Sequence, residues 1–185
     1  LLRPRFGDFC YDRYELAQME QSAAELVEAG ADGIVTGVLT PEGTLDIAAL
    51  RPIYAAARKA AVEAGRPVAC TLHRAFDVCR DPFAALAAAK ELGLATILTS
   101  GQAASAPQGA ELLRQLVEAA GSDVEILVGA GVSAGNLPAL AAQTGARAFH
   151  LSGKQVLDSR MTFRREGVPI CVLYGSCMDE RTIYF

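Results

Sequence analysis

A repeated pattern of amphipathic stretch, glycine and short apolar run occupies most of this chain. The amphipathic stretches stop at five glycines: Gly30, Gly65, Gly93, Gly121 and Gly145. These glycines are spaced about 24 to 35 residues apart, which is typical of a βα unit. Apolar strands linked by helices predict a parallel sheet with right-handed crossovers, and we expect each strand to be buried on both faces.

The predicted helices and strands alternate along the sequence. The helices cover residues 13–29, 47–64, 82–92, 108–120 and 133–144. The strands cover residues 33–37, 68–72, 95–98, 124–128 and 148–151, and residues 1–5 indicate the end of one more strand. Helix starts are indicated by Asp12 with Glu15 in a capping-box pattern, by Asp46, by Asp81 before Pro82, and by Ser133.

The predicted strands end in glycine or in polar side chains, as at Thr36 and Thr99. Near-equal units with such endings favour a closed barrel over an open sheet, because all strands of a barrel deliver residues to one face. A complete eight-unit barrel has about 250 residues, whereas this chain has 185 and begins with Leu1. We therefore predict an α/β fold, a TIM-type (β/α)8 barrel that lacks its front. Residues 1–165 are the predicted barrel domain, and residues 166–185 a tail that matches no unit.

One strand end carries three functional groups within five positions. The apolar run 68–72 stops at His73 and Arg74, and Asp77 follows. If the strand stays extended, His73 and Asp77 point the same way and Arg74 the other. A histidine beside a carboxylate suits general acid–base catalysis, or metal binding with a supporting acid. We predict His73, Asp77 and Arg74 as catalytic residues; the alternatives are a structural His–Asp hydrogen bond or a solvated strand end.

Other strand ends suggest an anion site at the same barrel mouth. Arginine pairs with carboxylates and phosphates through two parallel hydrogen bonds, and a glycine loop before a helix can cradle phosphate. An internal ring of salt bridges and a plain tight turn are the alternatives. The predicted ligand-binding residues are Arg3, Arg5, Asp8, Thr36, Thr99, Ser100, Gly129, Gly131 and His150.

Composition excludes several classes of partner. The net charge is −4 and no long basic cluster occurs, which argues against nucleic acid. No apolar stretch is long enough to span a bilayer. The five cysteines contain no C-x-x-C pair, so a disulfide framework or a zinc site is not indicated. A reducing cytoplasm is the simplest location, with the nucleus as an alternative, and a homo-oligomer is left open.

Several motifs resemble the CutC family of copper homeostasis proteins over roughly residues 1–165. The matching stretches are 3–9, 33–37, 71–77, 97–101, 129–131, 136–137 and 149–150. The resemblance implies an eight-unit βα barrel, a cytoplasmic location and copper handling. By this alignment residues 3–5 close the third strand, His73 the fifth, Gly129 to Gly131 the seventh and His150 the eighth. The first two βα units and most of the third strand are then absent.

The resemblance implies copper as the bound ion. Cu(I) prefers thiolate and thioether ligands with imidazole as a helper, so Cys10, Cys79 and His73 are the candidate ligands, while Cys70 reads as a buried small hydrophobe. The cysteines most favoured as ligands in the family would lie in the missing front. The function that the resemblance implies is copper binding and intracellular copper homeostasis. One alternative is a barrel enzyme, such as an aldolase, isomerase or hydrolase, for a small phosphorylated or carboxylated metabolite. Another is a chain that cannot close its barrel.

Overall fold

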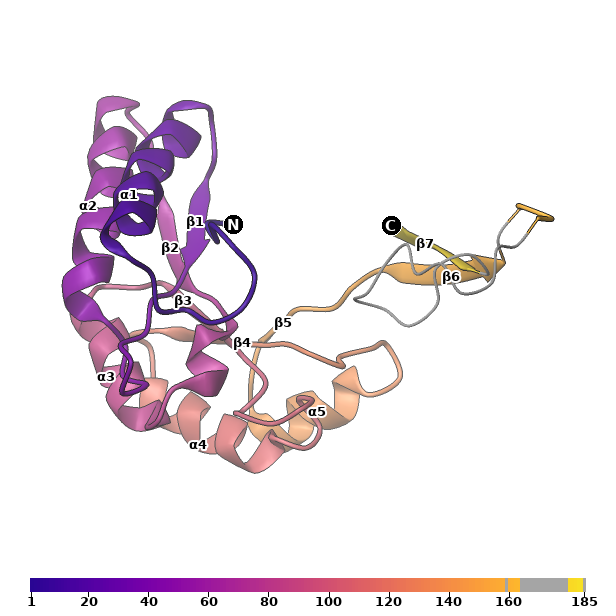
Figure 1. Ribbon diagram of the computed structural model, residues 1–185. Helices are drawn as coiled ribbons and strands as arrows, with labels where there is room; N and C mark the ends of the chain where they lie inside the picture. The colour runs from indigo at the N-terminus through magenta and orange to yellow at the C-terminus, as the bar shows by residue number, and fades with distance from the viewer. Residues whose placement is uncertain (159, 164–179, 185) are drawn as a thin grey trace. The chain divides into compact units, whose positions relative to one another are not determined.

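The computed structural model describes residues 1–158, 160–163 and 180–184, in two units, Leu1–His150 and Leu151–Phe185. The first unit contains a five-stranded parallel sheet in the order β1-β2-β3-β4-β5 (Figure 1). The strands are β1 (Gly33–Thr36), β2 (Ala69–Leu72), β3 (Thr96–Thr99), β4 (Glu125–Val128) and β5 (Ala148–Phe149). Successive strands are neighbours, as expected for repeated βα units.

Helices join the strands of the first unit. They are α1 (Arg13–Glu28), α2 (Ile47–Glu63), the short 3-10 helix η1 (Arg74–Val78), α3 (Pro82–Glu91), α4 (Ala110–Ala120) and α5 (Leu137–Thr144). Figure 1 shows α1 and α2 side by side next to β1. The α/β fold predicted from the sequence, part of a TIM-type barrel, is confirmed by this alternation of parallel strands and helices.

Three helix starts follow from local sequence chemistry, as predicted. Asp12 accepts hydrogen bonds from the N–H groups of Tyr14 and Glu15, and Glu15 completes the capping box. Asp46 accepts from Ala49 N–H, and Asp81 accepts from the first turn of α3. Each carboxylate satisfies otherwise unpaired N–H groups and opposes the positive end of the helix dipole.

The predicted start of the last helix is wrong. Helix α5 begins at Leu137 rather than after Ser133. The reason is the Asn136 side chain, whose oxygen accepts from Ser133 N–H at 2.8 Å and whose amide donates to the Gly131 carbonyl at 2.8 Å. These two bonds hold residues 131–136 in a turn, so the helix starts only where the turn ends.

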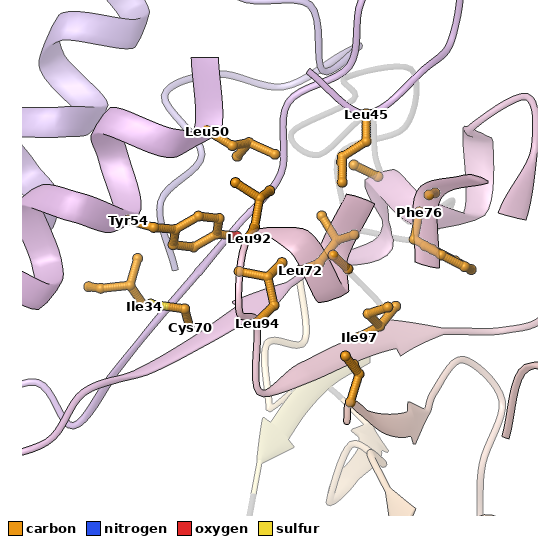
Figure 2. Close-up of a cluster of buried hydrophobic side chains, with 14 of the residues drawn as sticks. Ile34, Leu45, Leu50, Tyr54, Cys70, Leu72, Phe76, Leu92, Leu94 and Ile97 are labelled. Atoms are coloured by element: carbon orange, nitrogen blue, oxygen red, sulfur yellow. The ribbon is translucent and has the colours of Figure 1, made fainter. Parts of the chain in front are cut away.

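A hydrophobic core fills one face of the sheet. Alternate strand residues such as Ile34, Leu72 and Ile97 are almost fully buried there. Figure 2 shows them in one cluster with Leu50 and Tyr54 of α2. The Tyr54 hydroxyl also donates to the carbonyls of Thr36 and Thr71, at 3.4 and 3.2 Å. Helix α2 is therefore fixed to β1 and β2 both by apolar burial and by polar bonds.

The other face of the sheet is only partly buried, so the expectation of strands buried on both faces is wrong. Val35, Thr71, Leu98 and Leu127 alternate with the core residues and keep intermediate exposure. Side chains on a strand alternate between faces, and the described helices supply apolar partners to one face only. We call the partly exposed side the inner face.

The predicted strand end at residues 1–5 is not a strand in the structure. Leu2 nevertheless lies along β1, because its N–H donates to the Val35 carbonyl at 2.8 Å. The Thr36 hydroxyl in turn donates to the Leu2 carbonyl at 2.9 Å. Residue 2 thus occupies the place beside β1 that the alignment assigns to the end of a third barrel strand.

The second unit contains an antiparallel pair, β6 (Lys154–Asp158) with β7 (Glu180–Tyr184). The sequence pattern did not predict this pair. The predicted domain boundary at residue 165 and most of the predicted tail lie outside the described residues. None of the helices in the described ranges is long and apolar enough to cross a membrane.

The packing of α2 predicts two stability losses of different size. Leu50→Ala should lower the free energy of unfolding by about 2–5 kcal/mol, because it leaves a cavity in a fully buried site. Tyr54→Phe should cost only about 1 kcal/mol, since it removes two long hydrogen bonds and little volume. Urea unfolding measures both, and equal losses would contradict this description of the core.

Candidate functional site

A cavity of about 530 Å³ lies against the inner face, and we call it the sheet cavity. Its volume is in the range of small-molecule sites. Its floor consists of side chains on the inner face of the sheet. Glu125 lies at the N-terminal end of β4, whereas His73 and Arg74 follow the C-terminal end of β2. The lining residues are Leu1, Arg3, Phe9, Val35, Thr71, His73, Arg74, Thr96, Leu98, Glu125, Leu127 and His150. Four of the predicted ligand-binding or catalytic residues, Arg3, His73, Arg74 and His150, therefore share this cavity.

The chain turns sharply after β2, and the extended path expected for residues 73–77 is wrong. Residues Arg74–Val78 form η1, and His73 is its N-cap. The His73 ring accepts a hydrogen bond at Nδ1 from Ala75 N–H at 3.1 Å, and the His73 carbonyl accepts from Phe76 N–H at 3.1 Å. The turn separates the two side chains expected to act together: Asp77 faces the end of β3, whereas His73 packs against Phe9.

Asp77 is a buried anchor. Only 6% of its side-chain surface is exposed. Its carboxylate accepts hydrogen bonds from the Thr99 hydroxyl (2.5 Å) and Arg74 Nε (2.6 Å). It also accepts from the backbone N–H groups of Ser100 (3.0 Å) and Gln102 (3.2 Å). The acceptor positions of this carboxylate are therefore occupied by groups of the protein itself.

Gln102 completes the attachment of η1 to the loop after β3. It adopts a left-handed backbone conformation, with φ of 53°, which is uncommon for a residue other than glycine. Its side-chain amide donates to the carbonyls of Phe76 (3.2 Å) and Cys79 (2.8 Å). Sequence reasoning missed Gln102, since no motif distinguishes this glutamine from a surface residue.

Arg74 is held in one orientation on the wall of the sheet cavity. Nε donates to Asp77 and Nη2 donates to the Ser100 hydroxyl at 3.1 Å. Nη1 makes no hydrogen bond within the described residues, and 45% of the side chain is exposed. A guanidinium fixed along one edge presents its remaining donors in a defined direction.

His73 is buried, with 6% exposure. Its ring lies 4.9 Å from that of Phe9, and a Cβ added at Gly37 would be only 2.8 Å from it, so the ring has little freedom. Because Nδ1 accepts an N–H, the proton of the neutral ring is on Nε2, and Nε2 has no partner among the described residues. Burial lowers the pKa of His73 to about 4, so the ring is neutral at pH 7.

The predicted arginines of the first motif are separated in the structure. Arg3 lines the sheet cavity, and its guanidinium lies 4.8 Å above the ring of Phe9. Arg5 instead pairs with Asp8 at 2.9 Å and with Glu15 of α1 at 2.6 Å, away from the cavity lining. For Arg5 and Asp8 the geometry agrees with the salt-bridge alternative.

The remaining predicted ligand-binding residues have structural contacts. Thr36 and Thr99 are fully buried and donate to the Leu2 carbonyl and to Asp77. Gly129 is packed so closely against Leu98 that a Cβ there would be 2.6 Å from its side chain. Gly131 has a φ of 73° and belongs to the turn held by Asn136. Neither glycine lines the sheet cavity.

The described thiols belong to no cluster of three or more candidate metal ligands. Burial raises the pKa of Cys79 to about 11, and its sulfur is engaged by Gln102 Nε2 at 3.3 Å and by the Asp81 carbonyl at 3.5 Å. Cys10 is partly buried in the first loop, and Cys70 is buried in the core, as predicted. Within residues 1–158, 160–163 and 180–184, no three His, Cys, Asp or Glu residues are grouped to hold a metal ion.

His73 is also unsuited to metal binding in this arrangement. A metal-bound histidine normally donates its second ring N–H to an acceptor. Here the second nitrogen faces the N–H donor of Ala75, so coordination through Nε2 would set two donors against each other. Use of His73 as a Cu(I) ligand would therefore require the bond to Ala75 N–H to break.

Sequence reasoning missed several residues of the cavity, among them Phe9, Thr71, Leu98 and Leu127. For the strand residues a signal was present, because Thr71, Leu98 and Leu127 alternate with the core positions and must lie on the opposite face of the sheet. The prediction took that face to be buried under helices, so it did not mark these residues as a cavity lining. Phe9 belongs to the motif at residues 3–9, but its ring contact with His73 joins residues far apart in sequence and could not be predicted from either segment alone.

Comparison with known proteins assigns the chain to a family. The CutC family model matches residues 1–155. CutC of Vibrio vulnificus strain YJ016 is 46% identical over 167 residues, which is 90% of this chain and 64% of that protein. CutC of Parabacteroides distasonis is 40% identical over 170 residues, 92% of this chain and 67% of the relative. The chain thus spans slightly less than two thirds of the Vibrio protein.

A solved structure agrees with the sequence matches. It is CutC from Streptococcus agalactiae, which carries the name of a copper homeostasis protein. Its TM-score is 0.73 at 30% identity, over 80% of this chain and 69% of that one. The family model covers the residues of η1, of the Asp77 anchor and of the sheet cavity, and with the sequence identities above it shows that this chain belongs to the CutC family.

Proposed function

We propose that the sheet cavity binds a small carboxylate- or phosphate-bearing metabolite, with Arg74 as the main anion-binding group. One observation carries the proposal: the Arg74 guanidinium is fixed on the cavity wall by Asp77 and Ser100, with Nη1 unused among the described residues. Such a group matches the oxygens of a carboxylate or phosphate. Because its side chain is already ordered, binding costs little conformational entropy.

The charge around Arg74 remains favourable to an anion. The Asp77 carboxylate is shared among the Thr99 hydroxyl and two backbone N–H groups, so it does not belong to Arg74 alone. Arg3 adds a second guanidinium on the same cavity. Glu125, the acid of the lining, starts β4, whereas Arg74 follows the C-terminal end of β2. We expect the anionic group of the ligand to lie near the C-terminal ends of the strands, and its apolar part to lie against Leu98 and Leu127.

The enzyme alternative, an aldolase, isomerase or hydrolase, would use the same cavity. The described residues would bind and orient the substrate. Arg74 and Arg3 would hold its anionic group, and the apolar side chains of the inner face would contact the rest of it. Asp77 is already saturated with donors, so we assign it a positioning role toward Arg74 rather than a proton-transfer role. We propose no catalytic base among the described residues.

Copper handling is the second candidate function. It is supported by the name of the Streptococcus agalactiae protein and by the free thiol of Cys10, which is only partly buried. Copper is then the cargo, held in a reducing cytoplasm where thiols stay free. Cys10 and Cys79 are the proposed ligands. Loading would require Cys79 to lose its proton and its bond to Asp81.

Replacing Arg74 tests the anion site. Arg74→Gln should raise the dissociation constant for inorganic phosphate at least about tenfold, because it removes a charged hydrogen-bond donor. Isothermal titration calorimetry measures the constant, and Arg114→Gln is the matched control, since Arg114 pairs with Glu111 and Glu118 on the surface of α4. Phosphate binding that is unchanged in the Arg74 variant would exclude Arg74 as the anion-binding group.

The copper proposal predicts a thiol- and pH-dependent affinity. The double variant Cys10→Ser with Cys79→Ser should bind Cu(I) at least about tenfold more weakly than the unaltered chain, in competition with a chelator. Since burial raises the pKa of Cys79 to about 11, binding must release a proton, so affinity should increase from pH 6 to pH 8. Affinity that survives both substitutions would place copper elsewhere.

Burial of neutral His73 predicts a loss of stability in mild acid. The pKa is about 4 in the folded chain and about 6.5 when unfolded, so the unfolded state binds more protons between these values. Stability is then complete above about pH 6.5 and falls toward pH 4, by up to about 3 kcal/mol. Urea unfolding across this range should give a shallower pH dependence of stability for His73→Asn than for the unaltered chain. Equal slopes for unaltered and His73→Asn chains would contradict the buried neutral ring.

A further inference from the structure

We infer that the ligand of the sheet cavity carries an ammonium group at the far end of its carbon chain from its anionic group, as an ω-amino carboxylate does, and that Glu125 binds this ammonium group. The inference rests on the proposed anion site and names its substrate class. It starts from a row of polar side chains across the inner face. Thr71 of β2, Thr96 of β3 and Glu125 of β4 are neighbours in the strand register, and all three line the cavity.

The acceptors of this polar row are unused and accessible. Within residues 1–158, 160–163 and 180–184, the side chains of Thr71, Thr96 and Glu125 make no hydrogen bond or ion pair. The two threonines are partly exposed, and Glu125 is exposed. Register partners on parallel strands project from the same face of a sheet, so the three side chains present their oxygens together to a ligand in the cavity.

The chemistry of the row matches an ammonium group. An ammonium nitrogen has three donors and no acceptor, whereas hydroxyl and carboxylate oxygens accept. Neighbouring strands are about 4.8 Å apart, so a nitrogen between the side chains of Thr96 and Glu125 can reach both at hydrogen-bond distance. Glu125 adds the opposite charge, which makes its hydrogen bond the stronger one and disfavours an anion at this end.

The cavity separates this row from its cations by an apolar row. Leu98 and Leu127 follow Thr96 and Glu125 by two residues on the same strands, and both line the cavity. Positions two residues apart on a strand are about 7 Å apart. Arg74 follows the C-terminal end of β2, beyond the apolar row. A methylene chain against the two leucines would therefore link the charged ends of the ligand, and an α-amino acid, which carries both groups on one carbon, cannot reach both ends.

The first test compares three acids of six carbon atoms. In 6-aminohexanoate the ammonium group is at the far end of the chain, in norleucine it is next to the carboxylate, and hexanoate has none. Isothermal titration calorimetry on the unaltered chain should give 6-aminohexanoate at least about tenfold tighter binding than either of the other two, because only this acid makes a charged hydrogen bond at both ends of the cavity.

Replacing Glu125 tests its part in this preference. Glu125→Gln keeps the size of the side chain but removes its charge, so it should weaken binding of 6-aminohexanoate about tenfold. It should not weaken binding of hexanoate or of inorganic phosphate, which have no group for this end. Glu118→Gln is the matched control, since Glu118 pairs with Arg114 on the surface of α4, and it should leave the binding of all these ligands unchanged.

The outcomes separate this inference from the anion site. If phosphate binds but 6-aminohexanoate binds no tighter than norleucine, the ω-amino class is wrong and the anion site stands. A preference that persists in Glu125→Gln, or that is lost equally in Glu118→Gln, overturns Glu125 as the group that binds the ammonium. Absence of binding for the three acids and for phosphate overturns the anion site and this inference with it.

Discussion

The buried carboxylate of Asp77 is the interaction on which the site depends. It joins η1 to the end of β3 through Thr99, Ser100 and Gln102, and it orients Arg74 at the same time. A carboxyl group with 6% of its side-chain surface exposed needs hydrogen-bond partners from the protein, because water cannot supply them. The position of η1, and with it that of Arg74 and His73 on the cavity wall, follows from this requirement.

Local chemistry made most of the fold predictable. Glycines that end helices, carboxylates that begin them and short apolar runs between them located five strands and five helices to within a few residues. The predictions failed where a side-chain contact outside the regular pattern determines the local structure. Asn136 delays α5 by bridging Ser133 and Gly131, and no pattern of hydrophobicity reports such a bridge. The inner face was misread because short apolar runs look alike whether one or both faces are covered.

The residues of the site were identified better than their roles. Arg74, Asp77, Thr99 and Ser100 are joined by hydrogen bonds in the structure, whereas His73 packs against Phe9. The expected pairing of His73 with Asp77 assumed that the strand stays extended through residue 77. Instead, His73 caps η1 by accepting the Ala75 N–H, and the chain turns directly after β2. A histidine at the start of a 3-10 turn was not among the signals used. The same cap fixes the proton on Nε2, so one local hydrogen bond changed both the geometry and the chemistry expected of the residue.

The thiols and the cavity therefore favour different ligands within one chain. Cu(I) needs thiolates, and the Cys79 thiol is held protonated by burial, with its pKa raised to about 11. The cavity, in contrast, offers fixed donors that need no proton loss before they bind an oxygen ligand. Binding of an anion is thus available to the described residues as they are arranged, whereas binding of copper requires rearrangement around Cys79 or ligands from other residues. Because anion binding requires no rearrangement of the described residues, the smaller free-energy cost of binding belongs to the anion.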